Sequence, residues 1–88
     1  MDMRNCIHSI LRGRYGQAAD VIIEMLREKR PEQRRKKEQI AKILESKYLK
    51  IRDINDGYTL QEKAERVCTE TYAELMFPES SQDNLSGL

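Results

Sequence analysis

The sequence has few of the residues that carry catalysis or metal binding. Its 88 residues include one histidine, His8, and two cysteines, Cys6 and Cys68, and no Gly-x-Ser-x-Gly, Walker or dinucleotide-binding loop occurs. Cys6 and His8 are neighbours in sequence, but residues two apart on a helix point in different directions. A structural metal site needs about four ligands at set spacings. We therefore expect a protein that is not an enzyme, with no cofactor and no metal.

Long apolar runs are also absent. No stretch approaches the ~18 apolar residues of a membrane span, and residues 1–5 lack the apolar segment of a secretory signal. A secreted domain of this size usually carries more than two cysteines. These absences favour an intracellular protein, nuclear or cytoplasmic, in which both cysteines are reduced thiols and no membrane is a partner.

What the sequence does contain is apolar periodicity typical of helices. Apolar residues recur at helical spacing over about residues 4–12, 17–29 and 60–76, and again in the second half of a segment that starts at Pro31. Gly13 and Gly16 indicate a turn after the first helix. Thr59 and Glu62 form a capping-box pattern before the last helix. The periodicity predicts one shared core: Val21, Ile22, Met25, Leu26, Ile40, Leu44, Val67 and Leu75.

The pattern changes period near Tyr48. Leu49 and Ile51 alternate with charged residues, and Asp56-Gly57 is typical of a tight turn in which Gly57 takes a positive φ. We therefore predict a β-hairpin over residues 48–60. The expected fold is mainly α, with about four helices and one β-hairpin, in a single domain over residues 1–78. Residues 79–88 are polar and small, and we expect them to form a flexible tail.

Charge is unevenly distributed along the chain. Residues 1–52 hold 14 Lys/Arg and 7 Asp/Glu, whereas residues 53–88 hold 2 and 8. Pro31 suits the first position of a helix. Residues 32–39, the first half of that helix, contain no apolar side chain, so we expect them to face water or an anionic partner. The residues predicted to contact nucleic-acid phosphates are Arg27, Arg30, Arg34, Arg35, Lys36 and Lys37. No aromatic residues are interleaved for base stacking, and a solvated face or a protein-binding helix explains the segment equally well.

The order of helices, hairpin and final helix is that of a winged helix, although the segment from Arg30 to Lys47 is short for the two helices that family places there. Between Asn5 and Phe77 the chain resembles the N-terminal winged helix of the tandem winged-helix subunit of RNA polymerase III. The resembling positions are Cys6, Ile10-Leu11, Tyr15-Gly16, Ala19, Val21-Ile22, Leu26, Ile40, Leu44, Tyr48-Leu49, Tyr58 and Val67. This resemblance implies a nuclear transcription module that binds polymerase proteins and lies near DNA.

Two functions remain open on the sequence. The first is a nucleic-acid-associated adaptor, related to transcription, that uses the basic helix. The second is a purely protein-binding helical module, which acts as a subunit of a larger assembly or as a homodimer. Salt dependence separates the two, because phosphate contacts weaken steeply with salt and an apolar interface does not.

Overall fold

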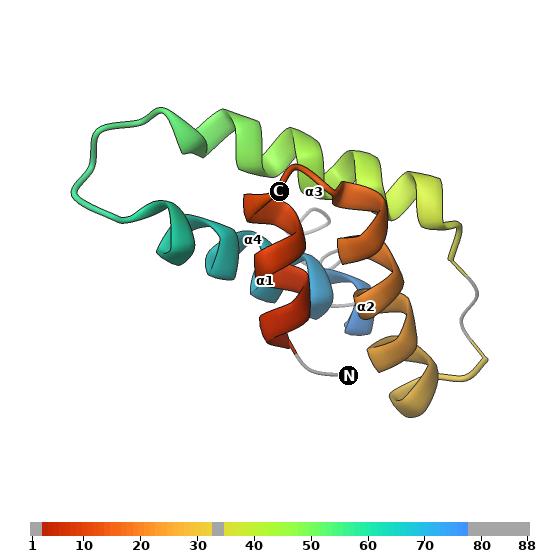
Figure 1. The fold of residues 1–88 in the computed structure, drawn as a ribbon. Helices are drawn as coiled ribbons and strands as arrows, with labels where there is room; N and C mark the ends of the chain where they lie inside the picture. The colour runs from red at the N-terminus through yellow and green to blue at the C-terminus, as the bar shows by residue number, and fades with distance from the viewer. Residues whose placement is uncertain (1–2, 33–34, 78–88) are drawn as a thin grey trace, which may run out of the picture.

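The computed structural model describes residues 3–32 and 35–77, and within them the chain forms four α-helices and no strand (Figure 1). The helices are α1 (Met3–Leu11), α2 (Tyr15–Lys29), α3 (Lys37–Arg52) and α4 (Leu60–Met76). The mainly helical class and the four helices are as predicted. No helix in these ranges is long and apolar enough to cross a membrane.

Local sequence signals set several of the helix ends. Gly13 has a φ of 72° in the turn between α1 and α2, a conformation that glycine adopts at little cost. α2 ends where the Arg30 N–H donates to the Leu26 carbonyl, directly before Pro31. α4 begins with the predicted capping box: the Glu62 N–H donates to Thr59 Oγ1 at 3.1 Å, and the Thr59 N–H donates to Glu62 Oε1 at 2.8 Å.

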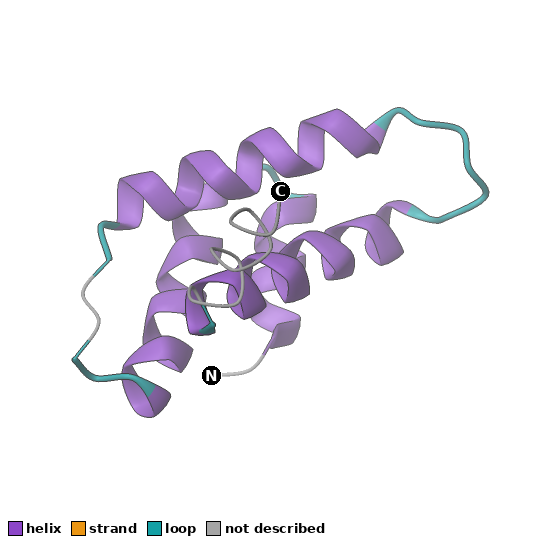
Figure 2. Ribbon diagram, turned by 180° about the vertical axis from the view of Figure 1, so that it is seen from behind, coloured by secondary structure: helices purple, strands orange, loops and turns teal. Residues whose placement is uncertain are grey.

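The four helices pack as a closed ring in which each contacts its neighbours in sequence and α4 returns to α1. Figure 2, seen from the opposite side, brings α4 to the front. The buried residues of all four helices form one core, which comprises Cys6, Ile7, Ile10, Ala18, Ala19, Val21, Ile22, Leu26, Ile40, Leu44, Tyr48, Ala64, Val67, Cys68, Leu75 and Met76. Seven of the eight predicted core residues are buried, whereas Met25 is only partly buried against this core.

The predicted β-hairpin over residues 48–60 is wrong. Residues 48–52 are the last turns of α3, and residues 53–59 form an irregular loop. The helical stripe of Ile40 and Leu44 continues to Tyr48, four residues further on, and Tyr48 is 4% exposed. That continuation outweighs the local alternation of Leu49 and Ile51, because it buries an aromatic ring in the core. Gly57 has the predicted positive φ, 86°, but in a loop between helices.

The prediction of a helix that begins at Pro31 is wrong about the helix start. α3 begins only at Lys37, and Glu32, Arg35 and Lys36 lie outside the helices. The physical reason is that these residues have no apolar side chain with which a helix could dock on the core. Residues 33 and 34, including Arg34, lie outside the described residues, as does the predicted tail over residues 79–88.

Candidate functional site

The predicted basic site runs from the C-terminal end of α2 to the start of α3, whereas the loop between α3 and α4 follows the other end of α3 (Figure 1). The basic site combines the C-terminal end of α2, the α2–α3 connection and the first residue of α3. Of its six predicted residues, the structure describes five: Arg27, Arg30, Arg35, Lys36 and Lys37. They do not form a continuous basic helix: Arg27 and Arg30 lie at the C-terminal end of α2, whereas Lys37 lies beside Asp20 in the first half of that helix.

Three of those five residues form ion pairs with acidic side chains. Arg27 pairs with Glu24 at 3.3 Å, Arg30 pairs with Glu32 at 3.9 Å, and Lys37 pairs with Asp20. The other two of the five, Arg35 and Lys36, make no ion pair within the described part of the chain. The pairs are exposed and individually weak, yet each places a carboxylate where a phosphate would have to approach.

Lys37 has a structural role in addition to its charge. Its Nζ reaches from α3 to Asp20 on α2 at 3.0 Å. Gly16 leaves space for its stem, since a Cβ at that position would lie 3.3 Å from Lys37 Cε. The lysine thus helps to join α2 to α3 at their contact, and this position was predicted only as a phosphate contact.

A second site lies between the end of α3, the α3–α4 loop and the outer face of α4. It is a cleft of about 390 Å³, which we call the acidic cleft. Four carboxylates and two basic residues are among the side chains that line it. The lining residues are Ile51, Asp56, Tyr58, Glu62, Lys63, Glu65, Arg66, Thr69 and Glu70.

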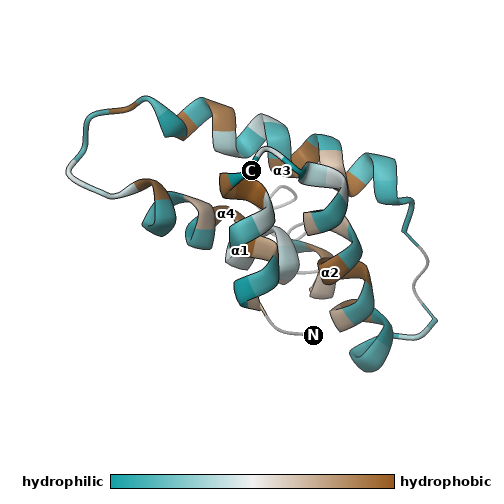
Figure 3. Ribbon diagram, in the orientation of Figure 1, coloured by the Kyte–Doolittle hydropathy of each residue, from teal (hydrophilic) through white to brown (hydrophobic). Residues whose placement is uncertain are grey.

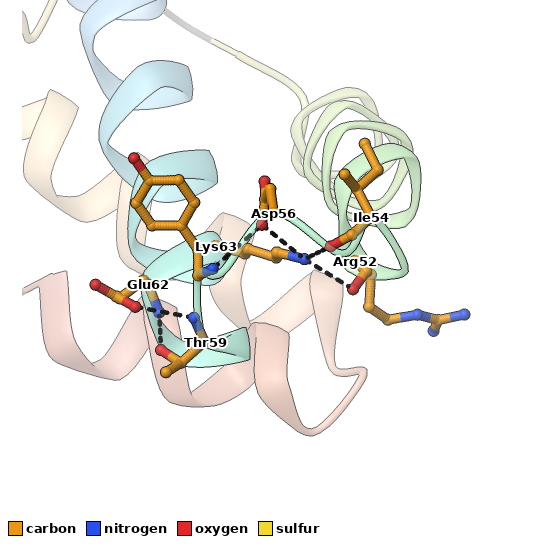
Figure 4. A network of polar contacts seen from close by, with 7 residues as sticks. Arg52, Ile54, Asp56, Thr59, Glu62 and Lys63 are labelled. Carbon is orange, nitrogen blue, oxygen red and sulfur yellow. Dashed lines mark hydrogen bonds and ion pairs between the residues drawn. The ribbon is translucent and has the colours of Figure 1, made fainter.

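A buried lysine holds the loop beside this cleft (Figure 4). Lys63 is 5% exposed, and its ammonium donates to the Arg52 carbonyl at 3.2 Å and to the Ile54 carbonyl. It also lies 3.5 Å from Asp56 Oδ1. The two carbonyls lie at and just beyond the C-terminal end of α3, where helix carbonyls have no partner within the helix. Lys63 therefore caps α3 from α4 across the loop.

Asp56 connects the lysine to the rest of the loop. Its Oδ1 accepts a hydrogen bond from the Tyr58 N–H at 3.2 Å. Desolvation raises the pKa of Asp56, but the Tyr58 hydrogen bond and the Lys63 ammonium outweigh it and hold the pKa below its ordinary value. The carboxylate thus remains charged and keeps the turn before α4 closed.

Large apolar side chains are exposed on the segment that leads from the end of α3 into α4, and one of them, Tyr58, lines the acidic cleft. Four of the seven large hydrophobic residues that are exposed in the described ranges lie between positions 49 and 60: Leu49, Ile54, Tyr58 and Leu60. Figure 3 shows hydrophobic positions on the loop and at the start of α4, away from the helix interfaces. Tyr58 is 57% exposed, and the Arg66 guanidinium lies 6.0 Å from the centroid of its ring. We call these four side chains the apolar rim.

Sequence reasoning missed this site because it interpreted the same residues as strands. Ile54, Tyr58 and Leu60 were assigned to a hairpin, in which one face would be buried. The signal that could have found the site is an apolar residue every few positions in a segment otherwise rich in Asp, Asn and Gly, which are loop residues.

The residues weighed for catalysis do not meet. His8 is exposed, whereas Cys6 on the same helix is fully buried. No group of three or more His, Cys, Asp or Glu residues in the described ranges could hold a metal ion.

No protein-family model matches the chain, and searches of the curated proteins and of the solved structures find no significant match.

Proposed function

We propose that this chain is a non-catalytic protein-binding module and that its acidic cleft receives a basic segment of a partner protein. The observation that carries the proposal is the apolar rim, one member of which lines the cleft. Four large apolar side chains, 43–57% exposed, lie in a stretch of twelve residues, and Tyr58 among them is part of the cleft wall. Exposed apolar side chains that gather at one place are typical of interaction sites, whereas scattered ones are ordinary.

The chemistry of the rim fits protein recognition. Tyr58 is a large, amphipathic side chain with few rotatable bonds, and tyrosine is enriched among residues that dominate binding energy. Its ring lies 6.0 Å from the Arg66 guanidinium, at the edge of the range in which a cation is attracted to an aromatic face. The concave cleft gives an entering side chain walls on several sides.

The charges of the cleft favour a partner segment of positive charge. Asp56, Glu62, Glu65 and Glu70 outnumber Lys63 and Arg66. The Lys63 ammonium is turned inward to main-chain carbonyls, and Arg66 pairs with Glu70 at 3.6 Å. A partner segment rich in Lys or Arg complements this surface, whereas phosphates would be repelled.

The nucleic-acid function is supported less well by the geometry. Three of the five described basic residues already face a carboxylate within 4 Å. Arg35 and Lys36 remain without an ion pair in the described ranges, and two phosphate contacts would supply only a shallow salt dependence.

The test selects peptides from a random displayed library on the full chain and then synthesises the enriched sequences. We expect Lys/Arg-rich peptides with interspersed apolar residues. On titration they should shift amide resonances of residues 49–70 and leave those of residues 15–29 nearly unchanged. Tyr58→Ala should weaken binding about tenfold or more, as expected for an anchor residue.

Phe77→Ala is the matched control, because Phe77 is an aromatic residue outside the cleft lining with 55% exposure, close to the 57% of Tyr58. It should change the dissociation constant by less than about twofold, within the range of near-neutral contacts. Enrichment of acidic peptides, or equal losses for both variants, would overturn the proposal.

Duplex DNA provides the opposing measurement. If the parent binds duplex DNA at about 100 mM salt and Arg35→Gln with Lys36→Gln abolishes that binding, the nucleic-acid function replaces the protein-binding one. If the parent does not bind DNA there, the basic residues act as a solvated face.

A further inference from the structure

The two cysteines of this chain meet in the core. Cys6 lies on α1 and Cys68 on α4, 62 positions apart in sequence, and their Sγ atoms are 2.9 Å apart. Both residues are fully buried and both are free thiols. Both cysteines were predicted to be reduced thiols, and nothing in their spacing in sequence indicates that they are in contact.

Their meeting follows from the packing of α1 on α4. Cys6 and Ile10 lie four residues apart on the buried side of α1, while Ala64 and Cys68 do the same on α4. Each sulfur occupies a position where the two helices contact each other. The Sγ atoms need to approach by less than ~1 Å to reach the ~2.05 Å of a disulfide bond.

We propose that Cys6 and Cys68 are a disulfide-forming pair, which a small-molecule disulfide such as oxidised glutathione converts into a covalent link between α1 and α4. In the first step one cysteine thiolate attacks a sulfur of glutathione disulfide, which releases one glutathione thiolate and leaves a mixed disulfide on the protein. The second cysteine thiolate then attacks the protein-side sulfur and releases the other glutathione. Two cysteines lose two electrons and two protons, and glutathione disulfide becomes two thiols.

The reaction depends on whether glutathione disulfide can reach the two buried sulfur atoms. Neither sulfur is exposed in the closed fold, and only a thiolate attacks a disulfide. The hydrogen bond to Cys6 and burial both raise the pKa of the Cys68 thiol. Reaction therefore requires α1 to separate from α4. α1 is the shortest helix in the described ranges, with nine residues, and elements with few buried apolar contacts open at lower free energy than the rest of a domain.

Reclosure of α1 brings the second thiol beside the mixed disulfide. That geometry favours the internal disulfide over a stable glutathione adduct, because the second attack is intramolecular. The link closes a long loop through α2 and α3, so it should stabilise the fold chiefly by restricting the unfolded chain.

The test uses the full chain, refolded from denaturant in buffer with excess oxidised glutathione and separately in dithiothreitol. We expect the oxidised sample to be a monomer that is lighter by two hydrogen atoms, with no thiol that reacts with Ellman's reagent. Digestion should yield one peptide pair joined through Cys6 and Cys68. The Tm should exceed that of the reduced sample by roughly 10–30 °C, and dithiothreitol should reverse the change.

Cys6→Ala and Cys68→Ala are the controls, and each should give a glutathione adduct or remain a free thiol, with no rise in Tm on oxidation. The wild-type comparison does not depend on whether these variants fold. Both thiols free after refolding in oxidised glutathione, accumulation of the glutathione adduct or a disulfide-linked dimer in the wild type would overturn the proposal. An internal disulfide that lowers the Tm would overturn it too, since the link would then distort the native packing.

Discussion

The buried ammonium of Lys63 provides the sharpest test of how α3 and α4 are held together. Its Nζ donates to the carbonyls of Arg52 and Ile54 and lies near Asp56. We choose the substitution Lys63→Met. Methionine keeps an unbranched apolar stem of similar length in the same space and removes all three donors together with the charge.

The expected magnitude follows from the contacts that are lost. A hydrogen bond to a charged group contributes ~1.5–3 kcal/mol, and a buried acceptor left without a donor costs ~1–3 kcal/mol. The substitution removes two such bonds and the ion pair, but it also relieves the desolvation of the ammonium. Water can reach the loop carbonyls once the loop relaxes. We therefore expect a loss of about 2–3 kcal/mol in the free energy of unfolding, which lowers the Tm by roughly 10–20 °C.

Urea denaturation followed by far-UV circular dichroism measures this loss as a lower midpoint with an unchanged slope. Lys42→Met is the matched control, since Lys42 is also on a helix, is exposed and makes no ion pair within the described ranges. It should change the stability by less than about 0.5 kcal/mol. Equal midpoints for Lys63→Met and the parent would refute the reasoning that the ammonium caps α3.

Three further predictions concern the core and the loop. Ile22→Ala should cost ~2–5 kcal/mol, because the side chain has no exposed surface; Leu11→Ala, at a position 38% exposed, should cost much less in the same thermal melts. Gly57→Val should lower the Tm more than Gly57→Asn, because φ is 86° and no atom lies within 4 Å of an added Cβ, so the cost is one of backbone conformation. Asp56→Asn should lower the Tm at neutral pH. The folded pKa of Asp56 is depressed, so its contribution is present above the ordinary value of 3.8 and is lost as the pH falls through the folded pKa. The difference from the parent should thus vanish in acid.

Helix positions could be predicted where local signals and the core stripe agree. The second helix was predicted within two residues at its start and correctly at its end, because its apolar stripe and Pro31 point to the same boundaries. The capping box of Thr59 placed the start of α4 correctly. In both cases the residues that determine the helix end lie within one short segment of the sequence.

The end of α3 could not be predicted, because two periods overlap there. Leu49 and Ile51 alternate as in a strand, yet Tyr48 also continues the stripe of Ile40 and Leu44. Only the presence of a pocket for the Tyr48 ring between the other helices decides between them, and that pocket is a property of the tertiary fold. The acidic cleft was missed for the same reason, since it depends on where α3 ends.

Contacts between distant residues lay beyond sequence reasoning altogether. Lys63 lies on the buried face of α4, together with Ala64 and Val67. From the sequence alone, a lysine is expected to be exposed to solvent. Its burial becomes understandable only when the α3 carbonyls are placed opposite it. Cys6 and Cys68 likewise meet only because α4 returns to α1.

The lysine cap and the proposed binding site are physically connected. Lys63 holds the loop through main-chain carbonyls, so the side chains of Ile54 and Tyr58 on that loop remain free to contact a partner. A loop fixed in this way loses little conformational entropy on binding, which strengthens affinity without any added contact. Lys63→Met should therefore weaken binding of the selected basic peptide even at temperatures well below its own Tm, where nearly all molecules are folded. The loss should appear as a slower association or a faster dissociation measured by surface plasmon resonance, while Lys42→Met binds as the parent does. If Lys63→Met binds the peptide with unchanged affinity, the cap stabilises the fold but does not preorganise the cleft.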